Sequence, residues 1–365
     1  MKKAERSLIE QARCKKGRYG GFCFGGCRPE GVRARDPLPA GTAWPNGAKA
    51  ALLLTFDVEG TYGNGTGDMA REIANYRRIC ARLSRAGIPA TFNVVGRMVE
   101  EQGPEFVRWM LECGSEIATH GYLHELNARY GGEDVYAGHY GPEENRQQLR
   151  DGVAALEKHF PGTVRGARLP YGHFNEYTYD AIAELGLAWA SNVSIDDFLT
   201  PGGGFGPAPF RMQLGETVYP VVEIPLDSQT YDWCIWAADE SANRPFVEAV
   251  RAYCAGKGIP FDRTPAGGVP VWLARCRDAI ARQAVFTLLC HPINLVVPSE
   301  RWKDPVEEFL FPVIDELGRL HRSGEAFVGT CGQVADRYLA WASGTPGKGP
   351  AGQPPQTSTK QEQSP

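Results

Sequence analysis

The sequence predicts an α/β fold in which about seven or eight parallel strands form a closed or nearly closed barrel. Apolar stretches of strand length alternate with amphipathic stretches of helical length along the 365 residues, and strands that are joined through helices run parallel. About eight strands follow one another without an intervening linker, and a run of that length favours a barrel over an open sheet.

The first strand and helix show this pattern most clearly. Residues 50–57, AALLLTFD, are almost entirely apolar, as expected of a strand that is covered on both faces. A helix is predicted over 68–87, because apolar residues recur at helical spacing from Met69 to Leu83 and Gly87 provides a C-terminal cap. Further strands are expected at 89–96, 115–120, 164–170, 187–193, 219–226, 284–291 and 325–330, and further helices at 104–114, 142–160, 175–186, 245–255, 268–284, 305–324 and up to residue 342.

The predicted barrel occupies residues 46–343 and is flanked by two segments of different composition. Residues 1–45 are rich in Gly, Arg and Pro and lack periodicity, so an irregular extension is expected there. Residues 344–365 contain one Ala and no other aliphatic or aromatic residue, which is too little apolar surface to offset the entropy lost on ordering. This C-terminal tail is therefore predicted to be disordered.

Composition and charge exclude several functional classes. The net charge of −4 shows no basic excess of the kind that binds nucleic acid. No apolar run reaches the roughly 20 residues of a membrane-spanning helix, and the basic N-terminus is not followed by the apolar core of a signal peptide. We therefore expect a cytoplasmic protein without a membrane span.

The ten cysteines fit a reducing environment. Most of them stand alone in apolar or helical stretches, as buried free thiols do. Cys14, Cys23 and Cys27 cluster near the N-terminus, but no fourth ligand stands nearby and their spacing matches no familiar zinc module. A basic, glycine-rich arm with free thiols is the preferred interpretation, with a three-cysteine metal site as the alternative.

Polar and titratable residues recur where the predicted strands end. In a barrel of parallel strands the carboxyl ends share one face, and active sites are built on that face. We therefore expect a functional site there. The residues at these ends are Asp57 and Glu59 on the first strand, His120 on the third with His124 four residues on, Arg168, Pro170 and Tyr171 on the fourth, Asp196 and Asp197 after the fifth, and His291 at the end of FTLLC.

Two histidines and two carboxylates in this set have the spacing of metal ligands. On a helical turn, the interval between His120 and His124 would place both imidazoles on one face, although the pair alone also fits ordinary surface or core histidines. In an extended strand, Asp57 and Glu59 point to the same side and Val58 points away. Two histidines with a carboxylate suit Zn²⁺, and also Co²⁺, Mn²⁺ or Fe²⁺.

The same residues resemble a known family. The segments TFDVEG, HGYLH, RLPYG and LLCH occur in this order and are similar to the successive motifs of the polysaccharide deacetylases, the NodB-like carbohydrate esterases. The resemblance covers roughly residues 48–342. WASNVSIDDF and VEIPLDSQTYDW look closer to one branch, which includes peptidoglycan deacetylase-like proteins and a metal-independent allantoinase.

The resemblance implies a distorted (β/α) barrel, a divalent metal, for which Zn²⁺ is the first choice, and hydrolysis of an acetamido group. By position, Asp57 would be the general base, Arg168 its partner and His291 the general acid. The metal ligands would be Glu59, His120 and His124. On the substrate side, Tyr171 would offer its backbone N–H to the oxyanion beside Pro170, Asp232 and Trp233 would line the pocket, and Asp197 would lie near it.

Two departures from the family pattern keep alternatives open. Val58 separates the two acids, the second of which is Glu59 and not Asp, and Gly121 stands where Ser or Thr is common. The expected function is a metal-dependent hydrolase of a non-peptide carbon–nitrogen bond that deacetylates an N-acetylated sugar or glycan. A metal-independent hydrolase of a cyclic amide or ureide is one alternative, and a catalytically inactive glycan-binding barrel is another. The resemblance also allows a homo-oligomer.

Overall fold

The computed structural model describes most of the chain between residues 32 and 344. The described residues are 32–60, 68–124, 142–172, 174, 176–195, 204–227, 230–237, 240, 244–296 and 299–344. The predictions for the N-terminal cysteines, for Asp196 and Asp197 and for the C-terminal tail fall outside these ranges.

One sheet of ten strands runs through the described chain, in the order β1-β7-β8-β6-β5-β4-β3-β2-β10, with β9 paired to β2. All of its strand pairs are parallel except β1–β7 and β7–β8, which are antiparallel. The prediction of about seven or eight parallel strands is therefore confirmed. The strands are β1 (Val32–Arg35), β2 (Ala51–Val58), β3 (Thr91–Val94), β4 (Glu116–Thr119), β5 (Gly166–Ala167), β6 (Trp189–Ala190), β7 (Phe210–Leu214), β8 (Thr217–Glu223), β9 (Val285–Cys290) and β10 (Phe327–Gly329).

Strand β2 is the centre of the sheet, and all eight of its residues are buried. One edge of β2 pairs first with β10, over residues 51–53, and then with β3, over residues 55–58, while the other edge pairs with β9 over residues 51–56. This triple pairing explains why the strand is almost wholly apolar, since it has neighbours on both edges and covered faces. Thr55 and Asp57 are its two polar residues.

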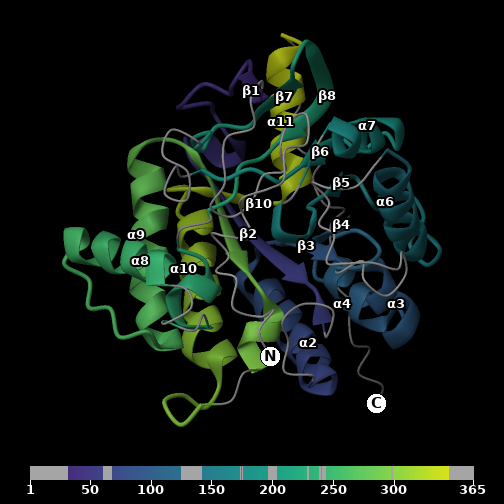
Figure 1. Ribbon diagram of the computed structural model, residues 1–365. Coiled ribbons are helices and arrows are strands. Elements are labelled where there is room, and N and C mark those ends of the chain that lie inside the picture. The colour runs from purple at the N-terminus through teal and green to yellow at the C-terminus, as the bar shows by residue number, and fades with distance from the viewer. Residues whose placement is uncertain are drawn as a thin grey trace, which may run out of the picture.

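The barrel is distorted because the sheet is not closed by strand pairing between β8 and β9 in the described chain. A single backbone hydrogen bond spans that opening, from the N–H of Asp227 to the carbonyl of Thr287 at 3.0 Å. The helices lie around the outside of the sheet, with α8, α9 and α10 on one side of β2 and α3, α4, α6 and α7 on the other (Figure 1). They are α2 (Met69–Ala86), α3 (Gly96–Gln102), α4 (Glu105–Glu112), α6 (Pro142–Glu157), α7 (Glu176–Glu184), α8 (Arg244–Lys257), α9 (Pro265–Ala281), α10 (Phe311–Arg322) and α11 (Cys331–Ala342).

Helix α2 ends as the sequence predicted. Gly87 has a φ of 70° and donates its N–H to the carbonyls of Leu83 and Ser84, so the left-handed cap is confirmed. At the other end, the side chain of Asp68 accepts the N–H of Arg71. None of the described helices is long and apolar enough to cross a bilayer.

Three local expectations differ from the structure. Residues 32–35 were expected in an irregular extension, yet they form β1, because β7 offers a free antiparallel edge. The strands expected at 164–170 and 187–193 contract to two residues each, since the chain leaves the ladder as soon as it reaches the polar face. The helix expected at 305–324 begins as a π-helical turn, Val306–Leu310, and becomes α-helical at α10.

Candidate active site and metal centre

Two acidic side chains lie close together at the carboxyl end of strand β2. Asp57 is its penultimate residue and Glu59 follows its end, and their exposed fractions are 4% and 7%. The Nε2 atom of His291 lies 4.0 Å from Asp57 Oδ2 and 3.7 Å from Glu59 Oε1, so both carboxylates face the same point. The predicted common orientation is therefore confirmed. Gly60 then turns the chain with a φ of 59°, in the region that favours glycine.

The carboxylate of Asp57 is held by two donors on the same oxygen. Asn93 Nδ2 and Arg168 Nη1 each lie 2.9 Å from Oδ1. Burial alone would raise the pKa of this carboxyl, but the charge of Arg168, with that of His120 and His291, lowers it below its ordinary value. Asp57 is therefore ionised at neutral pH, and its Oδ2 faces His291.

Arg168 is a fully buried arginine whose donors are spread over three partners. Its side chain is 1% exposed, and Nη1 binds Thr55 Oγ1 as well as Asp57, both at 2.9 Å. Its Nε donates to the carbonyl of Ser191 at 3.1 Å and its Nη2 to the hydroxyl of Ser191 at 2.8 Å. The guanidinium is thus fixed between the ends of β2 and β6.

The two histidines meet through a turn and not through a helix. His120 follows β4, and the chain then bends at Gly121, whose φ of 76° is left-handed. A Cβ at Gly121 would lie 2.9 Å from Nε2 of Gln148, which itself holds both backbone groups of Leu123. The helical turn expected for this spacing is therefore wrong. Glycine is favoured at position 121 because the backbone there is left-handed. The rings still lie 5.5 Å apart between centroids.

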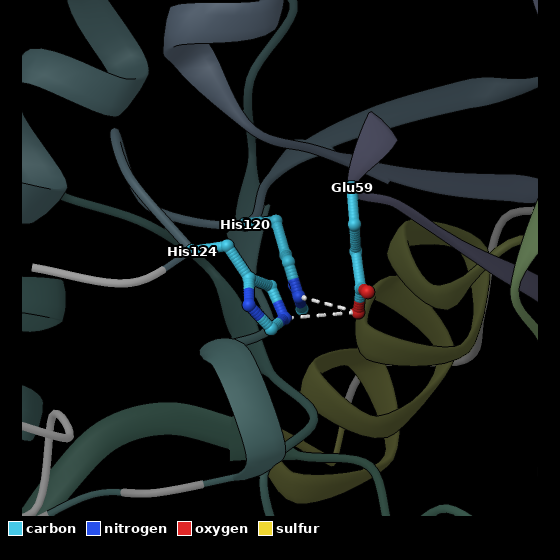
Figure 2. A group of neighbouring side chains, drawn as sticks. All are labelled: Glu59, His120 and His124. Atoms are coloured by element: carbon cyan, nitrogen blue, oxygen red, sulfur yellow. Dashed lines mark ion pairs between the residues drawn. The ribbon is translucent and has the colours of Figure 1, made fainter. Parts of the chain in front are cut away.

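Glu59, His120 and His124 point toward one another (Figure 2). Glu59 Oε1 lies 3.1 Å from His124 Nε2 and 3.5 Å from His120 Nε2, and all three side chains are almost wholly buried. Burial alone would raise the pKa of Glu59, but the charges of His124 and His291 and the two histidine contacts lower it well below its ordinary value.

These three side chains fit a divalent cation. Ligand atoms at about 2.0 Å from a tetrahedral Zn²⁺ lie about 3.3 Å from each other, and the two separations measured from Glu59 Oε1 bracket that value. All three ligand atoms lie within 4.8 Å of one another. Neither ring nitrogen of His120 makes a hydrogen bond of normal geometry within the described part of the chain. A metal bound at Nε2 would give that nitrogen the partner it lacks among the described residues.

His291 is oriented by Asp232. The carboxylate of Asp232 accepts the ring Nδ1 at 2.9 Å and the backbone N–H of His291 at 3.0 Å, and Asn294 Nδ2 donates to the same carboxylate at 2.8 Å. Burial would lower the pKa of this imidazole, but the charges of Asp232, Glu59 and Asp57 raise it to about 10. The ring is therefore protonated at neutral pH, with Nε2 turned toward the two acids of β2.

The remaining predicted site residues have different outcomes. Asp232 is fully buried and its carboxylate holds the ring of His291, so its expected place in the lining of the substrate pocket stays a prediction. Trp233 is partly exposed and stacks on Tyr231, whose ring lies 5.5 Å from that of His291. Pro170 is buried and starts the turn Pro170–Gly172. The backbone of Tyr171 lies in that turn, its side chain is not described, and Asp197 lies outside the described residues.

Sequence reasoning missed four polar side chains of this site. They support the predicted residues and are Thr55, Asn93, Ser191 and Asn294. Asn93 could have been found, because it is a lone amide within the apolar strand TFNVV. Thr55 carries no comparable signal, since threonine is common in strands, and Ser191 is a single small residue whose hydroxyl does not mark a partner.

Comparison with known proteins agrees with this site and fold. Residues 45–190 match the family model of the polysaccharide deacetylases, which confirms the resemblance that the motifs indicated. No curated protein matches the chain in sequence.

Several solved structures share the fold. A structure assigned as a polysaccharide deacetylase from Mycobacterium smegmatis superposes with a TM-score of 0.62 and 22% identity, over 84% of this chain and 96% of that chain. Another assigned so, from Pseudomonas aeruginosa PAO1, gives 0.52 and 15%, over 84% and 95%. PuuE allantoinase gives 0.52 and 16%, over 84% and 95%. At these identities the likeness is one of fold, and it agrees with the distorted (β/α) barrel.

Proposed function

We propose, on the premise that residues 45–190 match the polysaccharide deacetylase family, that this chain is a metal-dependent hydrolase of non-peptide carbon–nitrogen bonds. Deacetylation of an N-acetylated sugar or glycan is the reaction that the site supports best. The observation that carries the proposal is the position of His291 Nε2, which lies 4.0 Å from Asp57 Oδ2 and 3.7 Å from Glu59 Oε1, the carboxylate that also contacts His120 and His124.

Glu59, His120 and His124 would hold the cation, and Zn²⁺ is the first choice for two imidazoles and one carboxylate. When bound, the cation supplies Lewis-acid chemistry: it polarises the amide carbonyl and lowers the pKa of a water toward neutrality. A catalytic site of this kind has three protein ligands and keeps one position open. Asp57 lies beside the ligand set and outside it in this assignment, which leaves its carboxylate for proton transfer.

Asp57 is suited to act as the general base. Its Oδ1 is engaged by Arg168 and Asn93, while its Oδ2 faces the site. Oδ2 is therefore the oxygen that would take a proton from the attacking water. The guanidinium keeps the carboxylate ionised and fixes its direction, so the base does not have to reorganise as the reaction proceeds.

His291 is suited to act as the general acid. Its Nδ1–H donates to Asp232 Oδ1, which fixes the ring and leaves the Nε2 proton directed into the site. Expulsion of an amine requires protonation of its nitrogen, because an amide anion is a poor leaving group. The proton would pass from Nε2 to the departing nitrogen as the carbon–nitrogen bond breaks, and the products are an acetate and a free amino group.

One observation favours a second candidate. Glu59 Oε1 and His124 Nε2 are 3.1 Å apart, which is also within the range of a direct N–H···O hydrogen bond. Such a pair would satisfy both side chains without a cation, as a metal-independent hydrolase of a cyclic amide or ureide would require. An inactive glycan-binding barrel has no comparable support, since a binding site needs no base opposed by an acid.

The test is acetate release from a panel of N-acetylated sugars, with a cyclic ureide as the comparison substrate. The wild type should release acetate, lose activity on chelation and regain it with Zn²⁺. Asp57→Asn should lose a factor of about 10²–10⁴ in kcat. Ring opening of the ureide that ignores chelation would favour the second candidate, and acetate release that survives Asp57→Asn would contradict the proposed base.

A further inference from the structure

We propose that Glu223 and Asn192 are positioning residues that together fix the chain segment holding Arg168 against Asp57. Both side chains are fully buried. The inference rests on the proposed function only in so far as Arg168 and Asp57 act in catalysis. The geometric claim, that Glu223 and Asn192 determine where the guanidinium stands, can be tested without any activity.

Glu223 fixes the direction in which the chain leaves β6. It is the last residue of β8, and its Oε1 accepts the backbone N–H groups of Asn192 and Val193 at 2.5 and 3.0 Å. Its Oε2 accepts the hydroxyl of Tyr179, on α7, at 2.6 Å. Because two successive amides donate to this one oxygen, both peptide groups are held at a fixed distance from the end of β8.

Asn192 connects this segment to the chain that follows β5. Its Oδ1 accepts the backbone N–H of Leu169 at 2.8 Å. Leu169 stands between Arg168 and Pro170, so this one bond fixes the backbone from which the guanidinium extends. The same bond fixes the start of the turn Pro170–Gly172, which contains the backbone N–H proposed for the oxyanion.

Ser191, directly before Asn192, completes the connection to the base. Its carbonyl and hydroxyl accept two of the bonds from Arg168, and its hydroxyl donates to the carbonyl of Ile224 at 2.7 Å. Glu223 and Ile224, at the end of β8, therefore hold residues 191–193, and residues 191–193 hold the guanidinium. A shift of this segment would move Arg168 relative to Asp57.

A purely structural role would not require a carboxylate at this position. Burial raises the pKa of Glu223 to about 7, against the effect of the hydrogen bonds from Tyr179, Asn192 and Val193. An apolar side chain of similar size is usually cheaper to bury than a carboxylate. A costly acceptor that aligns two amides beside the residue that binds Arg168 therefore indicates positioning.

The experiment compares variants that remove the acceptor with variants that keep it. Glu223→Met and Asn192→Ala remove the acceptors, whereas Glu223→Gln and Asn192→Asp each retain an oxygen in the same place. Glu116→Met is the matched control. Glu116 is also a carboxylate of raised pKa that accepts a backbone N–H, from Gly332 at 2.7 Å, but it begins β4 and lies at the opposite end of the strands.

The first readout is the Arg168 Nε–H signal in ¹⁵N-arginine NMR spectra, assigned with Arg168→Lys. This proton is buried and donates to Ser191, so it should be visible in the wild type. Glu223→Met and Asn192→Ala should shift or abolish the signal, and the conservative variants should restore it. The second readout is acetate release from the β-1,4-linked trimer of N-acetylglucosamine. There kcat should fall about tenfold to a hundredfold, with KM within about twofold.

An Arg168 signal that stays at the wild-type position in Glu223→Met and Asn192→Ala would overturn the inference. So would an equal change of signal and kcat in Glu116→Met. A wild type that releases no acetate from the trimer counts against the proposed function alone, and the Arg168 signal then decides the positioning claim. Should Glu223→Met fail to fold, Asn192→Ala and its partner Asn192→Asp carry the same test.

Discussion

Replacement of Arg168 by Met gives the sharpest prediction about the buried ion pair. Methionine fills much of the same space but carries neither charge nor donors. The variant loses the four hydrogen bonds that Arg168 makes to Asp57, Thr55 and Ser191. It leaves Asp57 as a buried carboxylate without its cationic partner. Removing one partner of such a pair costs about 3–5 kcal/mol in the free energy of unfolding.

The cost should depend on pH. Burial tends to raise the pKa of Asp57, and Arg168 lowers it below the ordinary 3.8. In the wild type, ionised Asp57 therefore adds stability above its unfolded pKa, and this contribution is lost as the pH falls through the folded pKa. In Arg168→Met only the charges of His120 and His291 oppose the effect of burial, so the pKa of Asp57 rises. The stability difference between the two proteins should be large at pH 7–8 and should shrink toward pH 4.

The assay is urea unfolding at a series of pH values for the wild type, Arg168→Met, Asp57→Asn and the double variant. The double variant should lose less than the sum of the single variants, because no unpaired charge remains. Arg165→Met is the control, since Arg165 pairs with Asp336 on the surface and should cost at most about 1 kcal/mol. A stability difference for Arg168→Met that does not depend on pH, or strict additivity in the double variant, would show that Arg168 does not stabilise the ionised form of Asp57.

Three further predictions concern the pH dependence and the metal. The pKa of Glu223 is raised from 4.5 to about 7 in the folded protein, so the wild type should lose about 3 kcal/mol in its free energy of unfolding as the pH rises over that interval. Glu223→Gln should not show this loss. Asp232→Asn should move the basic limb of the kcat profile to lower pH, because Asp232 is the largest of the charges that raise the pKa of His291 to about 10. Glu59→Gln should weaken Zn²⁺ binding in equilibrium dialysis at least about tenfold, by loss of an anionic ligand.

Each of these predictions has a contradictory outcome. A constant stability difference between Glu223→Gln and the wild type across pH 4.5–8 would mean that Glu223 titrates normally. A basic limb that stays in place in Asp232→Asn would separate that limb from His291. Zn²⁺ binding that is unchanged in Glu59→Gln would place the cation elsewhere, and Glu116→Gln, at the start of β4, is the control carboxylate for that experiment.

The sequence was sufficient to predict the architecture because the information is local. The strand at 50–57 is specified by its nearly continuous apolar run, and the helix by apolar residues at helical spacing and the cap at Gly87. The ends of strands β5 and β6 could not be predicted, because the chain beyond them is held by side-chain hydrogen bonds between Arg168 and Ser191 and between Leu169 and Asn192, which no local pattern encodes. Strand β1 could not be predicted either, since only the distant β7 makes residues 32–35 extended.

The candidate site was predictable where one residue signals its own chemistry. Asp57, Glu59, His120, His124, Arg168 and His291 stand out as polar ends of apolar strands, and the structure brings all six together. The bond between Asp232 and His291 was not predicted, because the sequence position of Asp232 does not show that its carboxylate lies beside that ring. The second layer, Glu223 with Asn192, depends on contacts between β6 and β8 that no local pattern encodes.

Titration of Zn²⁺ into metal-free protein, with acetate release followed at each addition, tests the central claim most directly. We expect the rate of acetate release from the N-acetylglucosamine trimer to rise linearly with added Zn²⁺ and to stop rising at one equivalent per chain. We also expect Asp57→Asn to bind the same single equivalent yet remain inactive. Acetate release that is already complete without metal, or that is equal in Asp57→Asn, would contradict the claim.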